Sequence, residues 1–399
     1  MNPPLQRVFL DHHSTTPCDP RVVAAMLPWF HERPGNAASP HLFGWEAKQA
    51  VEDAQQHIAT LVNCRPSEIV FTSGATESNN LALQGLMRAE AGKQRHLVIS
   101  SLEHPSVLQT AHALAAEGFE LSVVPPRQGG IVDPADLQAA FRDDTLMCSV
   151  HWAHNEIGCV QPIEAIGRLC RARNIRFHSD ATQAVGRIPV DARHADLLSF
   201  SAHKMYGPKG IGALVVRRVS PRIRLRPLFH GGGQQHGHRS GTLPVSLVVG
   251  FGAACRLASE LQREEGVRIL RLRERLHERL RAGLDGVLLN GEAERRLPGN
   301  LNLSFLGVEA QALLLQLPGV ALSVGSACHT DDGLPSPALL ALGRSPEEAH
   351  AAIRFGIGRE NTEAEIDGVA DAVIAIVRKM REQTPVHAAN RARYSEEPI

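Results

Sequence analysis

Short apolar runs alternate with longer amphipathic stretches between about residue 45 and residue 216. The strand-like runs are residues 69–71, 97–100, 121–124, 146–150, 175–178, 197–200 and 212–216. The helical patterns are residues 46–62, 79–91, 105–117 and 162–173. This alternation is typical of an α/β fold with a mostly parallel sheet. Because such sheets bind ligands at the carboxyl ends of strands and at helix N-termini, motifs there are the first candidates for chemistry.

The pattern changes near residue 257, where a long charge-rich helix is predicted over residues 257–284. Strands near 300–305 and 353–358 follow, with helices over 310–317, 346–352 and 362–381. We therefore predict a large domain over 15–257 flanked by helices, and a smaller α+β domain made of 1–14 and 258–382, with helix 257–284 as the bridge. Residues 383–399 show no periodicity, and we expect a disordered tail.

Composition narrows the possible functions. The 399 residues carry 42 Lys and Arg against 42 Asp and Glu, and this zero net charge disfavours direct nucleic-acid binding. We see no membrane-spanning stretch and no signal or transit segment, and the seven cysteines are scattered without a C-x-x-C pair. A reducing, cytoplasmic location is therefore expected. The 20 histidines form no H-E-x-x-H motif, so no metal site is predicted.

Residues 72–80, TSGATESNN, follow a predicted strand and open a predicted helix. Gly74 lets the turn close, and Ala75 and Thr76 would present backbone N–H groups and a hydroxyl at the helix start. Such a helix start is a ready anion site. An ordinary helix cap would use the same residue types, so the motif alone leaves both interpretations open.

Two further motifs lie at the ends of predicted strands. Asp180, in HSDATQ, would be costly to bury without a cationic partner such as a protonated ring nitrogen, although a helix cap is the alternative. Lys204, in the Gly- and Pro-containing loop 201–210, is well placed to form a Schiff base, although most single lysines are solvated surface residues. Together the three motifs are the parts that a pyridoxal phosphate site needs. His104 lies at the same predicted sheet edge and offers an imidazole for a ring face.

With these residues in view, the chain resembles the fold-type I, class V aminotransferase superfamily, and specifically the IscS/NifS-type (group I) cysteine desulfurases. The resemblance covers nearly the whole chain and rests on blocks in a fixed order, which are residues 11–17, 35–39, 155–158, 231–234, 239–242, 323–328 and 353–358. It implies a pyridoxal 5'-phosphate-dependent transferase of fold type I in which domain 15–257 binds the cofactor.

The resemblance also implies a role for each matching residue around the cofactor. Lys204 would form the Schiff base, His104 would stack on the ring and move protons, and Asp180 would pair with the pyridine nitrogen. The remaining implied cofactor contacts are Gln183 at the phenolic oxygen, and Ala75, Thr76, Ser201 and His203 at the phosphate. Thr242 would reach the phosphate of a neighbouring subunit, which implies a homodimer.

For the substrate, the resemblance implies L-cysteine, with Asn155 and Arg354 binding its carboxylate. Cys328, in a polar loop between Gly325 and Gly333, would be the nucleophile. Its thiolate would take the sulfur as a persulfide and leave L-alanine. The sulfur would then pass to an acceptor protein, either an iron–sulfur scaffold or a relay for thio-cofactors or tRNA thiolation. The other six cysteines are expected to be inert buried thiols.

Three departures from the family pattern keep alternatives open. Gln235-His236 replaces the usual Glu-Arg pair after the glycine run, and His154 replaces the first Asn of an Asn-Asn-Glu run. The loop 328–337 resembles that of selenocysteine lyases more than that of housekeeping desulfurases. The alternatives to a cysteine desulfurase are therefore a selenocysteine lyase, a class V aminotransferase that does not need Cys328, and a non-catalytic assembly partner.

Overall fold

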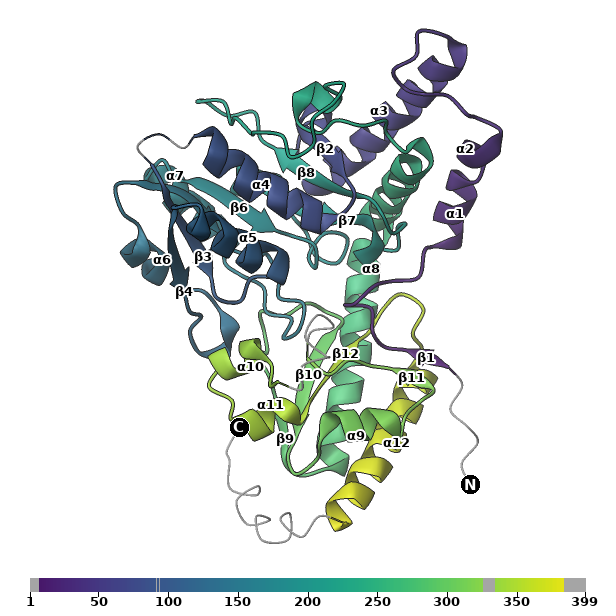
Figure 1. Ribbon diagram of the computed structural model, residues 1–399. Helices are drawn as coiled ribbons and strands as arrows, with labels where there is room; N and C mark the ends of the chain where they lie inside the picture. Colours follow the sequence, from purple (N-terminus) through teal and green to yellow (C-terminus); the bar gives the residue numbers. More distant parts are fainter. Residues whose placement is uncertain (1–6, 91, 93, 326–333, 384–399) are drawn as a thin grey trace.

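The computed structural model describes residues 7–90, 92, 94–325 and 334–383, and it shows two lobes along one long helix (Figure 1). The larger lobe contains a seven-stranded sheet in the order β2-β8-β7-β6-β5-β3-β4. The strands are β2 (Ile69–Thr72), β3 (His96–Ser100), β4 (Glu120–Val124), β5 (Thr145–Ser149), β6 (Arg176–Asp180), β7 (Leu197–Ser201) and β8 (Gly212–Val216). All neighbouring pairs are parallel except those of β8, which runs antiparallel to β2 and β7. The predicted α/β class with a mostly parallel sheet is confirmed.

Helices cover both faces of this sheet. Along each strand, successive side chains point to opposite faces, so Leu197 packs in one core cluster and Leu198 in the other. Helices α4 (Ala75–Ala89) and α5 (Pro105–Ala116) cover the first face. The second face is covered by α3 (Leu42–Val62), α6 (Pro134–Ala140) and α7 (Ile163–Ala172) together with the start of α8 (Val245–Gly283). The short helices α1 (Pro20–Met26), α2 (Pro28–His31) and α6 were not predicted.

The long helix α8 begins at Val245, so the prediction that it begins at 257 is wrong. Its first part is apolar and contains glycines, and it therefore lacks the charged positions that mark the later turns as a surface helix. Gly252 lies directly against α3, where an added Cβ would stand 2.6 Å from the Cα of Ala54. The close approach of the two helices explains why a residue with poor helix propensity occurs there. The second part of α8 buries Leu272, Leu276 and Leu280 in the smaller lobe.

The smaller lobe has an antiparallel sheet in the order β12-β10-β9, formed by β12 (Ala352–Gly356), β10 (Asn300–Phe305) and β9 (Val287–Leu289). The N-terminal strand β1 (Val8–Phe9) joins this lobe by pairing in parallel with β11 (Val320–Ala321). The remaining helices are α9 (Ala310–Leu315), α10 (Pro337–Ala341), α11 (Pro346–His350) and α12 (Glu363–Glu382). The apolar core of the smaller lobe is separate from the two cores of the larger lobe.

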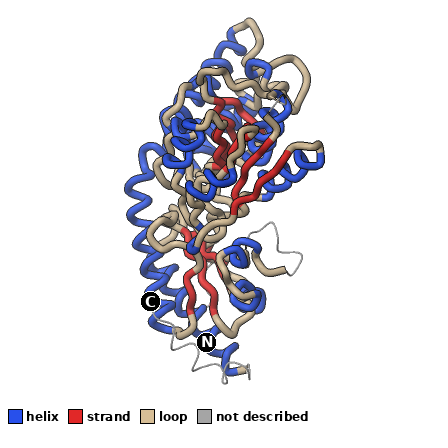
Figure 2. The backbone as a smooth tube through the Cα atoms, turned by 90° about the vertical axis from the view of Figure 1, so that its left-hand side faces the viewer, coloured by secondary structure: helices blue, strands red, loops and turns tan. Residues whose placement is uncertain are grey.

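The seven-stranded and three-stranded sheets lie in separate lobes with loops between them (Figure 2). The carboxyl ends of β6 and β7 carry Asp180 and the segment that leads to Lys204. In the described part of the chain, no helix has the length and apolar character needed to cross a bilayer. The predicted tail lies outside the described residues, apart from Gln383, which caps α12.

Candidate active site

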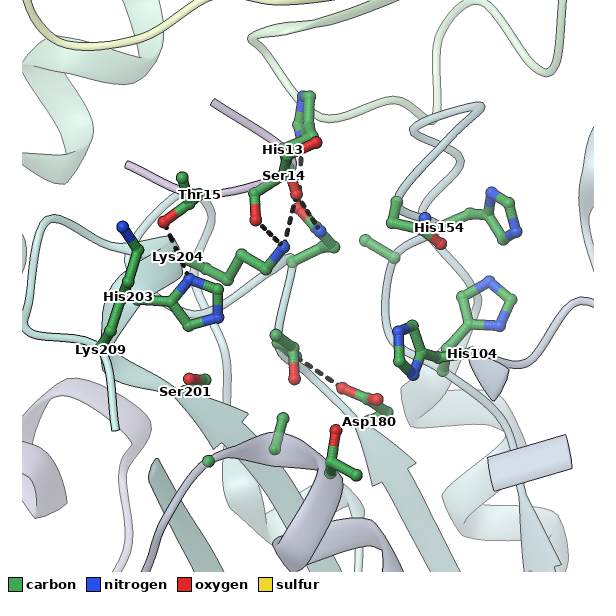
Figure 3. A pocket seen from close by; sticks show the side chains of 18 of the residues that line it. His13, Ser14, Thr15, His104, His154, Asp180, Ser201, His203, Lys204 and Lys209 are labelled. Carbon is green, nitrogen blue, oxygen red and sulfur yellow. Dashed lines mark hydrogen bonds between the residues drawn. The ribbon is translucent and has the colours of Figure 1, made fainter. Parts of the chain in front are cut away.

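A cavity of about 580 Å³ lies at the carboxyl ends of β6 and β7. Both lobes line it, because Arg354 of β12 reaches it as well as the residues of the large sheet. Its volume lies within the range of small-molecule sites. Figure 3 shows Lys204 directed at the His13–Ser14 segment, with Asp180 below it and with His104 and His203 on opposite sides.

One end of the cavity is the N-terminus of α4. Gly74 precedes the helix. Gly212, in the neighbouring strand β8, lies so close to Gly74 that a Cβ added to Gly212 would stand 2.7 Å from the Cα of Gly74. Thr72 Oγ1 donates to the carbonyl of Gly74 at 3.0 Å and fixes the turn. The first N–H groups of a helix have no intrahelical acceptor and carry a partial positive charge. Ala75 and Thr76 are therefore placed where an anion such as phosphate would bind.

His203 lines the same end of the cavity. Its Nδ1 lies 3.0 Å from Thr15 Oγ1. Burial, reinforced by the neighbouring Lys204, lowers the pKa of His203 to about 4. The imidazole is therefore neutral at pH 7, and it can offer an anion a hydrogen bond but not a full charge.

Asp180 ends β6, lines the cavity and is buried. Its carboxylate accepts hydrogen bonds from Asn79 Nδ2 at 2.7 Å and from the N–H of Thr182 at 2.9 Å. Among the residues that the structure describes, no Lys or Arg forms an ion pair with Asp180. A buried carboxylate with only neutral donors is unusual, because burial of a charge is costly without a counter-charge. A ligand cation such as a protonated ring nitrogen fits this position.

Lys204 follows β7 and lines the same cavity. Its Nζ donates to the carbonyl oxygens of His13 and Ser14 at 2.7 and 2.6 Å. Gln183 Nε2 donates to the same carbonyl of His13 at 2.9 Å. Behind the lysine, burial lowers the pKa of the Arg187 guanidinium to about 10. The amine is thus held by two backbone carbonyl oxygens at the cavity wall.

Arg354 enters the cavity from the smaller lobe, and only 1% of the residue is exposed. One terminal nitrogen donates to Asp11 Oδ1 at 2.8 Å, and the other donates to the carbonyl of Asn155 at 2.9 Å. Ser14 and Ser323 hydroxyls also lie within hydrogen-bond distance of this guanidinium. The arginine already has an internal carboxylate partner, which distinguishes it from Asp180.

Ten of the predicted site residues line this one cavity. They are Ala75, Thr76, His104, Asn155, Asp180, Gln183, Ser201, His203, Lys204 and Arg354. Thr242 is exposed and does not line it. Cys328 lies outside the described residues. The prediction that the other cysteines are buried is wrong for Cys18 and Cys64, which are half-buried, because they lie at the rim of the core.

Sequence reasoning assigned no role to four residues that shape the site, namely Asp11, Ser14, Asn79 and Ser106. Asp11 and Ser14 lie in a quoted sequence block, but their partner Arg354 is more than 300 positions away. Asn79 belongs to the motif at residues 72–80, and Ser106 follows His104 by two positions. This closeness in the sequence was the available signal.

Two of the substituted residues, Gln235 and His154, have structural explanations, and nothing in the described structure explains His236. Gln235 pairs with the free edge of the large sheet, since its Oε1 accepts from the N–H of Phe71 at 2.6 Å and its Nε2 donates to the Phe71 carbonyl at 2.8 Å. The glutamate usual in the family could make only the first bond. His154 Nδ1 accepts from the N–H groups of Glu156 and Ile157 at 3.2 Å each. Because burial holds the pKa of His154 well below its usual value, the ring remains an acceptor and fixes the turn that carries Asn155.

The family model "Aminotransferase class-V" matches residues 8–369. The chain belongs to this family. Within it, the chain is 50% identical over 383 residues to a protein named cysteine desulfurase IscS from Anaeromyxobacter sp. (strain Fw109-5), and the match covers 95% of both chains. The resemblance to the IscS/NifS-type cysteine desulfurases is confirmed.

Solved structures agree with this placement. A protein described as NifS-like superimposes with a TM-score of 0.87 at 34% identity, over 94% of this chain and all of the other. A second, described as SspA in complex with cysteine, gives a TM-score of 0.78 at 33% identity, over 89% of this chain and all of the other. The predicted fold type I is therefore confirmed.

Proposed function

We propose that this chain is a pyridoxal 5'-phosphate-dependent cysteine desulfurase that converts L-cysteine to L-alanine and places the sulfur on Cys328 as a persulfide. The observation that carries the proposal is one cavity that holds both Asp180 and Lys204 and includes a helix N-terminus. Asp180 is a buried carboxylate that forms no ion pair with a Lys or Arg among the described residues. The name of the IscS relative supports the same activity, and the structure described as SspA in complex with cysteine supports L-cysteine as the substrate.

The cofactor would supply an electron sink for the carbon that loses its proton. The donor set fits it at each point. Asp180 would hold the ring nitrogen protonated, Gln183 would hydrogen-bond the phenolic oxygen, and His104 would lie on the ring face. The phosphate would be held by the start of α4, through Ala75 and Thr76, with Ser201 and His203 as further partners.

Lys204 has two tasks in this proposal. It would hold the cofactor covalently until the substrate amine replaces it, and it would then take the proton from the substrate Cα. Its Nζ is held by two carbonyls at the cavity wall, so a small rotation of the side chain redirects it toward the cavity. A positioned amine is effective as a base because it approaches the reacting carbon without solvent.

Asn155 and Arg354 would bind the substrate carboxylate. The guanidinium forks between Asp11 and the Asn155 backbone, so an incoming carboxylate competes with Asp11 for it. A bidentate arginine–carboxylate contact orients the amino acid as well as binding it. Cys328 would then receive the sulfur and deliver it to an acceptor protein, an iron–sulfur scaffold or a relay for thio-cofactors or tRNA thiolation.

A homodimer is part of the proposal. Exposed apolar side chains gather on α1 and α2 and at the start of α3, and these are Val23, Leu27, Phe30, Leu42, Phe43 and Trp45. An exposed apolar patch of this kind is typical of an interface. Thr242 is exposed as well and would reach the phosphate site of the second copy. Trp45→Glu should shift sedimentation from dimer to monomer, and a monomeric wild type would contradict the dimer.

The experiment that tests the function measures alanine from L-cysteine and from L-selenocysteine, with a reductant, for three proteins. Wild type should form alanine from cysteine, and Cys328→Ala should lose that activity. Cys64→Ala is the matched control, because burial raises the pKa of this half-buried thiol to about 12 and leaves it unreactive. Cleavage of selenocysteine alone would instead indicate a selenocysteine lyase.

A further inference from the structure

Three buried side chains, those of Asp180, Asn79 and Ser106, form a continuous hydrogen-bonded chain with the half-buried His104. Asn79 Nδ2, on α4, lies 2.7 Å from Asp180 Oδ2 and 2.8 Å from Ser106 Oγ. Ser106, on α5, places the same Oγ 2.7 Å from His104 Nδ1. The chain thus joins the end of β6 to the first turn of α5 through α4, and Asn79 is fully buried within it.

The carboxylate at one end fixes the direction of every bond. An ionised carboxylate can only accept, so the NH₂ group of Asn79, and not its carbonyl oxygen, faces Asp180. The second hydrogen of that NH₂ group is donated to Ser106 Oγ, and the hydroxyl hydrogen of Ser106 is therefore left for His104 Nδ1. The backbone N–H of Ser106 also donates to this Nδ1, at 3.1 Å.

The imidazole is consequently held in one form. With two donors directed at Nδ1, that nitrogen is unprotonated, and the neutral ring carries its hydrogen on Nε2. We propose that Asn79 and Ser106 are positioning residues that lock His104 as the neutral Nε2–H tautomer, so that its Nε2 is a hydrogen-bond donor and not a base. This inference rests on the proposed function and deepens it.

An unsatisfied atom supports the assignment. The Oδ1 of Asn79 is buried and has no hydrogen-bond partner among the described residues. A buried acceptor without a donor is unfavourable, and an apolar side chain of similar shape would avoid it. The amide is thus useful here for its two N–H donors, which an apolar residue could not provide.

The direct test is ¹⁵N NMR of the histidine rings, in protein with and without pyridoxal phosphate. The His104 resonances are assigned by comparison with His104→Gln. Wild type should show the neutral tautomer protonated on Nε2 at pH 7, in both forms. A ring that carries its proton on Nδ1, or on both nitrogens, would overturn the proposal.

Variants test the two links of the chain. Ser106→Ala and Asn79→Leu should convert the single tautomer into a mixture and lower kcat roughly tenfold, the effect of one lost hydrogen bond in the transition state. Ser106→Thr keeps the hydroxyl and should restore both. Thr110→Val is the matched control, because it removes a buried hydroxyl one turn further along α5 that touches neither His104 nor Asp180. Unchanged spectra in Ser106→Ala would contradict the proposal.

Asn79→Asp offers a second variant of nearly equal shape. An acid with one proton can donate to Asp180 or to Ser106, but not to both, so the fixed direction of the chain should be lost. The NMR readout does not depend on turnover. A locked tautomer in a protein that forms no alanine would therefore reject the proposed function alone, whereas alanine formation with an unlocked tautomer would reject this inference alone.

Discussion

The two charged groups at the ends of the substrate cavity are held in opposite ways. Asp180 lies within one lobe and, in the part of the chain that the structure describes, accepts hydrogen bonds from neutral donors only. Arg354 lies between the lobes and already contacts the carboxylate of Asp11. A cationic ring nitrogen would therefore meet a carboxylate, Asp180, that pairs with no Lys or Arg among the described residues. A substrate carboxylate, in contrast, must share Arg354 with Asp11 or displace Asp11 from it. The first arrangement favours a resident cofactor, and the second favours a ligand that must leave after each turnover.

The largest effect is expected at the Asp180 end. Asp180→Asn keeps the shape and removes the charge, so the ring nitrogen would no longer be held protonated. We expect kcat to fall about 10²- to 10³-fold with little change in KM, since one electrostatic contact in a dry site contributes about that much. Steady-state alanine formation measures it. Asp196→Asn is the control, because that half-buried carboxylate accepts a hydrogen bond from the backbone N–H of Phe177 in the same sheet and does not line the cavity.

At the Arg354 end, the expected change is in KM. Arg354→Lys keeps the positive charge but cannot contact two partners in the fork geometry of a guanidinium. We expect KM for L-cysteine to rise roughly 10- to 100-fold, because hydrogen bonds to charged groups contribute about 1.5–3 kcal/mol. The kcat should stay within a few-fold of wild type. A kcat that falls while KM is unchanged would place the substrate carboxylate elsewhere.

The pH dependence of the free energy of unfolding tests the rigidity of strand β6, which carries both His178 and Asp180. Burial lowers the pKa of His178 to about 4, and its two nitrogens lie 2.8 and 2.9 Å from serine hydroxyls. In the unfolded chain His178 binds a proton near pH 6.5, whereas in the folded chain it does so only near pH 4. The free energy of unfolding therefore falls as the pH drops from 6.5 to 4. The expected contribution is about 1.4 kcal/mol per pH unit.

Urea denaturation between pH 7 and pH 4.5 measures this slope. His178→Asn should lower the stability at pH 7 and make the remaining slope shallower by about one proton. If the slope of this variant equals that of wild type, the pH dependence arises at other groups.

The smallest effect is expected from Asp11→Asn. This change keeps an acceptor for Ser14 and Arg354 but removes the competing charge. KM for L-cysteine should fall about threefold, and the free energy of unfolding should fall by about 1–3 kcal/mol because a charged hydrogen bond is weakened. A rise in KM would mean that Asp11 orients Arg354 and does not compete for it.

The contrast between Asp180 and Arg354 also explains which parts of the site could be predicted from the sequence. Lys204, Asp180 and the start of α4 follow directly from strand ends and local motifs, since the carboxyl ends of parallel strands meet at one edge of a sheet. The Asp11–Arg354 pair joins positions far apart in the chain and belongs to no local pattern. The early start of α8 was missed for a related reason, because its first turns are buried against α3 and carry no amphipathic signal.

The most direct test of the account identifies the lysine that holds the cofactor. The chain has five lysines, Lys48, Lys93, Lys204, Lys209 and Lys379, so peptide mapping is unambiguous. Protein purified with pyridoxal phosphate is reduced with borohydride, digested and analysed by mass spectrometry. The account predicts one pyridoxyl group per chain, on Lys204, and none in Lys204→Ala. A protein that carries no pyridoxyl group, or carries it on Lys209 or another lysine, would contradict the assignment of this cavity as the active site.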